Sequence, residues 1–412
     1  MDTHGWLTEL TSIDPEAPLD DLEWVRELVG NARVVALGEG AHFIEEFWTV
    51  RRRLVRFLCE QLGFRLIAAE FDLGEGEELA GWLADPADVR ELRTVSRGAA
   101  DWGMASTAHW LRSWGAPRGI RFAGLDAPNG GAAMAAMLAW VAQALRELDP
   151  DSAPVLERLE PIVRELSGTS VAGSAQAWAA LGVAQQDALT AGLARLHQRS
   201  GFLEAVLAER GGRARAAGLR QRLSALQCAD YALRANEAMH RGAEARLDMS
   251  ARDRFMADSL LALLEREPGE RVVILAHNGH VQKQPVVWDD YLSAHPLGMY
   301  LDRALGDDYR VIGTTTTGGV SSEMALDPSV PVGFRVVEAP LEPPRTGSLE
   351  AALLAAGHGD RLTLVSLRRA AAAGLSFLRV RSQGGYLTGD VAAAYDAFLS
   401  LPRLTIQRDL GF

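Results

Sequence analysis

A short apolar run at residues 34–37 is followed by two glycines and then by a long segment with helical periodicity. Four consecutive apolar residues predict a buried strand, and Gly38 and Gly40 allow the backbone to turn sharply where that strand ends. In the segment 44–62, apolar side chains recur every three or four positions on one stripe, which is typical of an amphipathic helix. A second apolar run, 66–69, follows. The pattern predicts a strand–helix–strand unit.

One arginine lies on the apolar stripe of this predicted helix. Arg51 follows Ile44 by seven residues, which places the two side chains roughly 20° apart around the helix. Three other basic residues of the helix are expected to point towards water: Arg52, Arg53 and Arg56. A guanidinium on an inward face is costly unless it is paired or faces a ligand. We therefore expect an anionic partner for Arg51, and Glu70 at the end of the next strand is the nearest candidate.

Four apolar runs of the chain finish in an ionisable residue. The third predicted strand, 120–126, ends in an acid, and the fourth, 272–276, runs into a histidine. In open α/β sheets, ligand sites lie beyond the carboxyl ends of the strands. Four such endings therefore favour one common site at one edge of the sheet. The residues at these four ends are Glu39, Glu70, Asp126 and His277.

Three histidines and two carboxylates of this cluster could carry chemistry without an obvious nucleophile: His42, His277, His280, Glu39 and Glu70. A neutral imidazole held by a carboxylate is a good general base near neutral pH, and it could take a proton from water that attacks an ester. A buried arginine or the second histidine pair could stabilise the developing oxyanion. Glutamate and histidine three residues apart could instead chelate zinc or manganese. An inward arginine would repel a cation, so we favour catalysis without a metal.

The middle of the chain, 132–264, is predicted to be almost entirely helical, because alanine is abundant, leucine recurs every three or four positions and prolines are few. We interpret residues 131–245 as long antiparallel helices that wall or cap the site. The first part of the core is then 1–130, and the second part, with the histidine pair, is 246–412. The expected fold class is α/β: a parallel or mixed central sheet flanked by helices, with a large helical insertion that forms a cleft over the strand ends.

Shorter patterns predict the remaining elements. They are a helix at 19–29, a short helix at 79–83, strands at 309–314 and 362–367, a proline-rich surface stretch at 340–344 and a closing segment at 395–402.

Composition excludes several classes of function. The formal net charge of −12, from 42 Lys and Arg against 54 Asp and Glu, disfavours nucleic acid as a partner, because phosphate binding needs a basic surface. No apolar run approaches the roughly 18 residues of a membrane span, and the polar start is unlike a signal peptide. Phosphate-loop, dinucleotide-binding, cysteine-based metal and Gly-x-Ser-x-Gly motifs are all missing. We expect a cytoplasmic protein without membrane contact, cofactor or metal.

Several motifs together resemble the erythromycin esterase family in order and spacing. Besides Arg51 and Glu70 they are Gly38-Glu39-Gly40-Ala41-His42, Glu46-Phe47, Gly63-Phe64, Gly124-Leu125-Asp126, Arg252-Asp253-Arg254-Phe255-Met256 and His277-Asn278-Gly279-His280-Val281. The match runs from about residue 34 to 320, and 395–405 resembles the family's closing segment. The resemblance implies a metal-independent hydrolase that opens macrolide lactones, with an α/β core and a helical part flanking a deep cleft.

The resemblance also implies roles for individual residues. His42 is then the general base, with five residues around the water and substrate: Glu39, Arg51, Glu70, His277 and His280. We assign Arg51, Phe43, Asp126 and Arg252 to substrate binding. Phe43 departs from the family, which usually has glycine after the motif histidine, and we expect this residue to reshape the mouth of the cleft.

Other functions stay open at this point. The same histidine could serve elimination or cyclisation in a tailoring enzyme of secondary metabolism, acting on other esters or lactones. A metal-dependent hydrolase and a small-molecule binding protein without turnover are further alternatives. The segment 131–245 matches no family motif that we can identify, and substrate choice is expected to reside there.

Overall fold

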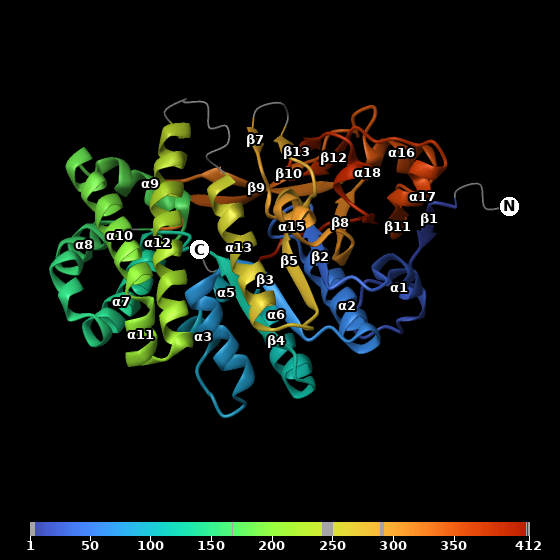
Figure 1. The fold of residues 1–412 in the computed structure, drawn as a ribbon. Helices are drawn as coiled ribbons and strands as arrows, with labels where there is room; N and C mark the ends of the chain where they lie inside the picture. The colour runs from blue at the N-terminus through green and yellow to red at the C-terminus, as the bar shows by residue number, and fades with distance from the viewer. Residues whose placement is uncertain (1–4, 167, 241–249, 289–291, 409, 411–412) are drawn as a thin grey trace.

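The computed structural model describes residues 5–166, 168–240, 250–288, 292–408 and 410. Its centre is an eight-stranded sheet (Figure 1). In spatial order the strands are β1 (Leu7–Glu9), β11 (Thr363–Ser366), β14 (Ala397–Leu401), β8 (Tyr309–Thr316), β2 (Val34–Glu39), β5 (Val272–His277), β3 (Leu66–Asp72) and β4 (Arg121–Asp126). The strands from β14 to β4 are parallel, whereas β1 and β11 run antiparallel to their neighbours. The sheet is therefore mixed, and the α/β fold class is confirmed.

Alternate residues of the central strand β2 face two helical layers. Val35 and Leu37 pack into one apolar core, and Val34 and Ala36 pack into another, as the period of two in a strand requires. The first layer consists of α1 (Glu23–Val29), α2 (Glu45–Leu62), α3 (Leu73–Ala84), α4 (Leu92–Val95), α5 (Arg97–Asp101) and α6 (Ala105–Trp110). The second consists of α13 (Ser250–Arg266), α14 (Asn278–Val281), α15 (Leu297–Leu305), α16 (Leu349–Ala355), α17 (Leu367–Ala372) and α18 (Val391–Ala394). Because both faces are covered, the central strands read as continuous apolar runs.

Six helices form a separate bundle beside the sheet (Figure 1). They are α7 (Gly131–Leu148), α8 (Ala153–Glu165), α9 (Val171–Ala180), α10 (Val183–Phe202), α11 (Glu204–Gly211) and α12 (Arg213–His240). Their leucines fill an apolar core to which the rest of the chain contributes little. The bundle follows β4 and precedes α13 in sequence. The predicted boundary at residue 245 lies outside the described residues.

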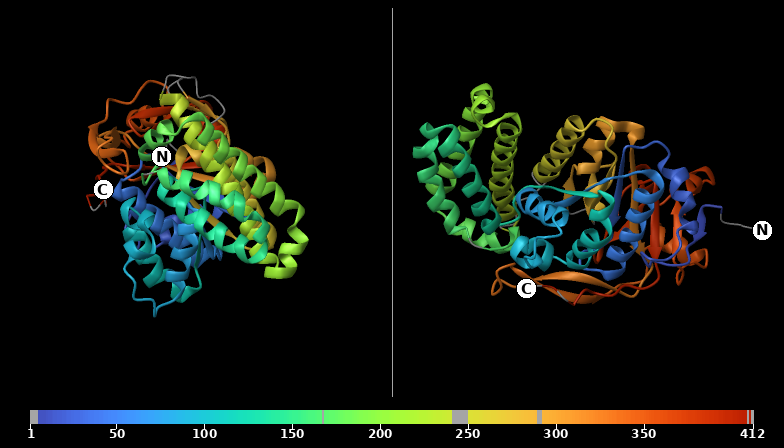
Figure 2. Two further views of the ribbon diagram at one scale, coloured as in Figure 1. Left: turned by 90° about the vertical axis from the view of Figure 1, so that its left-hand side faces the viewer. Right: turned by 90° about the horizontal axis from the view of Figure 1, so that it is seen from below.

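A long hairpin, β9 (Val320–Leu326) with β10 (Phe334–Pro340), connects the core to the bundle. It runs along one side of the molecule in the right-hand view of Figure 2. At its tip the carbonyl of Pro331 accepts a hydrogen bond from the Thr169 N–H at 3.0 Å, and that of Val332 accepts one from the Ser170 hydroxyl at 2.5 Å. These bonds fix the start of α9 against the hairpin.

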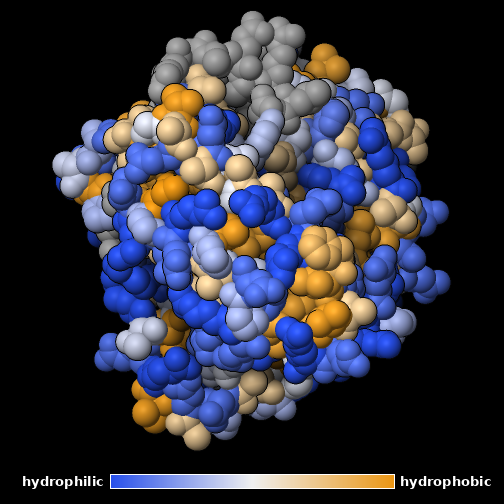
Figure 3. All heavy atoms as spheres, turned by 60° about the vertical axis from the view of Figure 1, so that its left-hand side comes forward, coloured by the Kyte–Doolittle hydropathy of each residue, from blue (hydrophilic) through white to orange (hydrophobic). Residues whose placement is uncertain are grey.

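Figure 3 shows polar residues over most of one face of the molecule, with apolar residues interspersed among them. Among the helices of the described residues, none combines the length and the apolar character that a membrane span requires.

The helix after β3 begins earlier than predicted. The apolar pattern predicts this helix at 79–83, whereas α3 spans Leu73–Ala84. Asp72 caps it by accepting a hydrogen bond from the Glu75 N–H at 2.8 Å. A glycine within the helix is required, because a Cβ at Gly76 would lie 2.6 Å from the Gly124 nitrogen of β4. Gly76 therefore allows α3 and β4 to pack closely.

Several strands were not predicted, including both seven-residue strands of the long hairpin. A separate four-stranded sheet is formed by β12 (Arg379–Ser382), β13 (Gly385–Thr388), β6 (Val286–Trp288) and β7 (Leu292–Ala294). Segments of three or four residues carry too little periodicity to be recognised. The helix predicted at 19–29 begins with a turn of 3-10 helix at Asp20–Leu22, which continues directly into α1.

The prediction that Arg53 points to water is wrong. Its side chain is 1% exposed and donates to the Asp21 Oδ1 atom at 2.5 Å and to the Ser12 carbonyl at 2.6 Å. The chain preceding α1 covers this flank of α2, which a helical wheel of α2 alone cannot reveal. Arg52 and Arg56 are also partly buried.

Candidate active site

The carboxyl ends of β2, β5, β3 and β4 lie side by side in the sheet. Glu39 and His277 are direct partners in the parallel register of β2 and β5. The backbone N–H of His277 donates to the Glu70 Oε2 atom at 2.9 Å. Strand β3 continues past Glu70 to Asp72, which is paired in register with Asp126 of β4. The four predicted strand endings therefore meet at one edge.

The turn after β2 is held by buried polar contacts. The Thr314 hydroxyl accepts a hydrogen bond from the Gly40 N–H at 3.0 Å and donates to the Gly38 carbonyl at 3.1 Å. A Cβ at Gly40 would lie 2.6 Å from the Thr314 carbonyl oxygen. The Asn278 side chain donates to that same carbonyl at 2.8 Å. Both the turn and this close packing therefore require glycine at position 40.

Glu39 joins His42 to Arg51. The His42 Nδ1 atom lies 2.8 Å from Glu39 Oε1, and Arg51 donates from Nη2 to Glu39 Oε2. Arg51 is fully buried, and its guanidinium lies 4.1 Å from the ring centroid of Trp48. Burial lowers the pKa of Arg51, while the carboxylates of Glu39 and Glu70 act in the opposite direction. The inward position of Arg51 is as predicted, but its bonded partner is Glu39 rather than Glu70.

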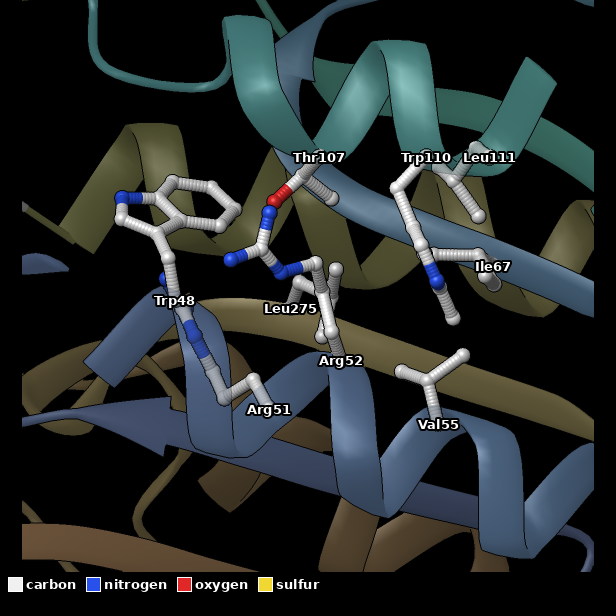
Figure 4. A pocket seen from close by; sticks show the side chains of 9 residues that line it. All are labelled: Trp48, Arg51, Arg52, Val55, Ile67, Thr107, Trp110, Leu111 and Leu275. Atoms are coloured by element: carbon white, nitrogen blue, oxygen red, sulfur yellow. The ribbon is translucent and has the colours of Figure 1, made fainter. Parts of the chain in front are cut away.

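Figure 4 shows the surroundings of Arg51 on its other side. A small recess between α2, the sheet and α6 is lined by two arginines, a threonine and six apolar residues: Arg51, Arg52, Thr107, Trp48, Val55, Ile67, Trp110, Leu111 and Leu275. The mainly apolar lining keeps this side of the guanidinium dry, which strengthens its attraction to Glu39.

Glu70 lies in a chain of alternating charges. His280 lies between two carboxylates, with Nδ1 2.7 Å from Asp253 Oδ1 and Nε2 3.2 Å from Glu70 Oε1. Arg252 donates to Glu70 Oε1 at 2.8 Å and, through Nε, to Asp126 Oδ2 at 2.8 Å. These partners occupy Glu70, which explains why it does not bond Arg51.

Neighbouring charges and burial give the histidines of the site different protonation states. Burial would lower the pKa of His280, but Asp253 and Glu70 outweigh it and raise that pKa to about 10. Burial, with the neighbouring His42 and His280, holds the pKa of His277 well below its usual range. Burial alone would raise the pKa of Glu70, yet His280 and Arg252 bring it well below the usual value. His280 is therefore a cation and His277 neutral near pH 7, which leaves His42 as the candidate base.

His277 lies beside His42 and is hydrogen-bonded to Gly279 and Ser382. Its ring centroid lies 4.9 Å from that of His42. Its Nδ1 atom accepts a hydrogen bond from the Gly279 N–H at 3.2 Å, and its Nε2 atom lies 3.2 Å from the Ser382 hydroxyl. Sequence reasoning missed Ser382, which lies on a four-residue strand far along the chain. Asp253, also missed as a site residue, stands in the same motif as Arg252.

Phe43 does not occupy the expected place. Its side chain is 2% exposed and packs with Trp102, Val332 and Phe334. The backbone there is left-handed, with φ of 58°, a conformation that glycine adopts without strain. The burial of Phe43 differs from our expectation that this residue reshapes the mouth of the cleft.

Ionisation of the buried Asp72 carboxyl lowers the stability of the fold, and this loss depends on pH. Asp72 is 8% exposed, its Oδ2 atom has no hydrogen-bond partner within the described part of the chain, and burial raises its pKa to about 7. In the unfolded chain the Asp72 carboxyl ionises near its ordinary pKa. The loss of folding stability is therefore absent below that pKa and complete above pH 7. Asp72→Asn keeps the helix cap and should stabilise the fold by about 2 kcal/mol more at pH 8 than at pH 5.

Denaturant unfolding at the two pH values measures this difference. Asp85→Asn, at an exposed residue after α3, is the matched control and should show no such dependence. An equal gain for Asp72→Asn at both pH values would mean that this carboxyl is ionised in the folded state without cost.

Comparisons with known proteins point to one family. A protein-family model described as Erythromycin esterase matches residues 59–404. The erythromycin esterase type II of Escherichia coli is 31% identical over 347 residues, 83% of either chain, and the type I enzyme is 28% identical over 400 residues, 96% of either chain. A solved structure of the erythromycin esterase EreC, a histidine-to-asparagine mutant in its open conformation, has a TM-score of 0.91 at 27% identity and covers 98% of this chain and 99% of its own. A succinoglycan biosynthesis protein shares the fold, with a TM-score of 0.69 at 21% identity over 97% of this chain and 95% of its own. The chain belongs to the erythromycin esterase family.

Proposed function

We propose that this protein hydrolyses an ester or lactone of a macrolide or a related secondary metabolite, with His42 as the general base. The observation that carries the proposal is the pairing of His42 Nδ1 with Glu39 Oε1 at 2.8 Å. An ionised carboxylate can only accept a hydrogen bond, so the neutral imidazole has its proton on Nδ1 and a free lone pair on Nε2. The erythromycin esterase names of the relatives support the substrate class.

In the proposed reaction, His42 Nε2 removes a proton from water while the water oxygen attacks the carbonyl carbon. Glu39 stabilises the imidazolium that forms, and Arg51 holds the other oxygen of that carboxylate. The tetrahedral intermediate then collapses, the carbon–oxygen bond to the alcohol breaks, and the leaving oxygen takes the proton from His42. The products are a carboxylate, once its acidic proton dissociates, and an alcohol, joined in one molecule when the substrate is a lactone.

Two cations support the oxyanion in this proposal. The side chains of Arg252 and His280 are 27% and 21% exposed, so each is partly open to a ligand while being held by buried carboxylates. Preorganised cations stabilise charge that develops in a transition state more than the same groups in water. We assign Glu70 and Asp126 the role of holding these two cations in place. In this proposal, His277 fills the space beside His42.

We further propose that no metal takes part. Arg51 occupies the Glu39 oxygen that a cation would need, and the described residues contain no group of three or more histidines, cysteines, aspartates or glutamates that could hold a metal ion. Activity should survive exhaustive chelation, and elemental analysis of the purified protein should give no stoichiometric zinc or manganese. Loss of activity that one particular metal restores would support the metal-dependent alternative.

A product screen by mass spectrometry tests the proposed function. The protein is incubated with erythromycin, other macrolides, simple lactones and aryl esters. Hydrolysis adds the mass of one water. An unchanged mass in a new product would indicate cyclisation or isomerisation, and a loss of mass would indicate elimination. Binding without any product would indicate a protein that sequesters its ligand.

A further inference from the structure

The tip of the β12–β13 hairpin reaches into the site from a part of the chain that the family motifs do not include. Ser382 is fully buried, and its hydroxyl lies 3.2 Å from the His277 Nε2 atom. The next residue, Gln383, donates from its backbone N–H to the Gly40 carbonyl at 2.7 Å. Two adjacent residues thus contact both the His277 ring and the turn that carries His42.

The contacts of His277 determine where its proton lies. The Gly279 N–H points at Nδ1 from 3.2 Å, so Nδ1 must supply a lone pair. A neutral imidazole has one donor and one acceptor nitrogen, and the proton is therefore on Nε2. That proton faces the Ser382 oxygen, which accepts it, and the Gly40 carbonyl is a further acceptor beside the ring. Protonating His277 fully would place an N–H group against the Gly279 N–H.

We infer that Ser382 is a positioning residue that, together with the Gly279 N–H, holds His277 as the neutral Nε2–H tautomer beside His42. The inference rests on the proposed function of His42 as the base. With ring centroids 4.9 Å apart, a positive charge on His277 would oppose the charge that His42 gains when it takes a proton from water. A His277 held neutral leaves His42 free to become the imidazolium.

The same geometry argues against Ser382 as a nucleophile. A serine is activated when a histidine nitrogen accepts its proton, but here the nitrogen that faces Ser382 carries its own. Forming the other tautomer would require breaking the bond from Gly279. Ser382 is, in addition, 0% exposed, so a substrate carbonyl cannot reach its hydroxyl in this structure.

The hairpin tip is itself held rigidly. Gln383 has a left-handed backbone, with φ of 50°. With its amide oxygen turned towards the turn after β2, it accepts a hydrogen bond from the His42 N–H at 3.3 Å. On the other side of Ser382, the Arg381 N–H donates to the buried Glu350 Oε1 atom at 3.0 Å. The backbone on either side of Ser382 is therefore held in place.

Nitrogen NMR of histidine-labelled protein tests the inference without relying on turnover. The His277 signals, identified by their loss in His277→Gln, should show a protonated Nε2 and an unprotonated Nδ1 in the wild type. In Ser382→Ala the Nε2–H group loses its serine acceptor, so the Nε2 signal should shift while Nδ1 stays unprotonated. A wild-type His277 with its proton on Nδ1, or a Ser382→Ala spectrum identical to that of the wild type, would overturn the inference.

Kinetics give the second readout. Ser382→Ala should lower kcat on the order of tenfold and leave KM unchanged, since one neutral hydrogen bond is lost. Ser259→Ala is the matched control, because its hydroxyl is also buried but has no hydrogen-bond partner within the described part of the chain. An equal kcat in the two variants would contradict the role of Ser382, and so would labelling of Ser382 by a serine-directed acylating reagent. If wild-type protein has no hydrolytic activity, the proposed function fails, while the NMR result still decides the tautomer.

Discussion

His42→Gln is expected to lower kcat by at least about 10²-fold, the usual scale for loss of a general base, while the protein stays folded. Glutamine can still donate a hydrogen bond to Glu39 from its amide, but it offers no nitrogen lone pair to take a proton from water. Steady-state kinetics with the ester or lactone found in the product screen measure the loss, and a thermal melt checks the fold.

The matched control for this variant is His109→Gln, which changes an exposed histidine on α6. It should keep wild-type kcat. If His42→Gln turns over at a rate near that of His109→Gln, His42 is not the base, and the mechanism must be assigned to other groups.

Arg51→Ala is expected to lose both stability and activity. Removing one partner of a buried ion pair typically costs about 3–5 kcal/mol, because the remaining charge is left uncompensated. Here the remaining group is Glu39, 5% exposed and also bonded to His42. An unpaired Glu39 can move or take up a proton, and either change alters the hydrogen bond that directs His42. Denaturant unfolding and kcat of the folded protein measure the two effects.

Arg53→Ala separates the two effects. Arg53 lies on the same helix, is equally buried and pairs with Asp21 rather than with a site residue. It should lose stability to a similar degree while the folded protein keeps its kcat. The exposed Arg368 on α17 gives the surface control, with an expected change within about 0.5 kcal/mol. If Arg51→Ala resembles Arg53→Ala in kcat, Arg51 has only a structural role.

The sequence predicted well what depends on local pattern. The apolar runs at 34–37 and 272–276 identified two central strands, and the residues that end them, Glu39 and His277, are neighbours in the sheet. The helical stripe placed Arg51 inside the protein. These predictions succeed because buried parallel strands and amphipathic helices have strong periodic signals, and because parallel strands share one functional edge.

The partner of Arg51 could not be predicted in the same way. Periodicity gives the direction of a side chain but not which of two nearby carboxylates it meets. Glu70 is occupied by His280 and Arg252, which come from a strand end and a helix some 180 to 210 residues further along the chain. Only the packing of α13 against the sheet shows that Glu39 is left for Arg51.

The burial of Arg53 and the contact between Ser382 and His277 could not be predicted from the sequence, for a similar reason. The chain ahead of α1 that covers Arg53 has no regular pattern, and β12, which carries Ser382, is four residues long. Contacts made by such segments depend on tertiary structure alone. The same is true of Phe43, whose aromatic cluster includes residues from a hairpin that the sequence did not reveal.

The central claim is that His42 activates water against an ester or lactone. The most direct measurement is mass spectrometry of the products formed in water labelled with heavy oxygen, for wild type and His42→Gln side by side. The account predicts a product heavier than the substrate by one labelled water, with the heavy oxygen in the new carboxylate, and a rate that His42→Gln lowers at least about 10²-fold. A product without heavy oxygen, a product that has gained no water, or equal rates in the two proteins would contradict it.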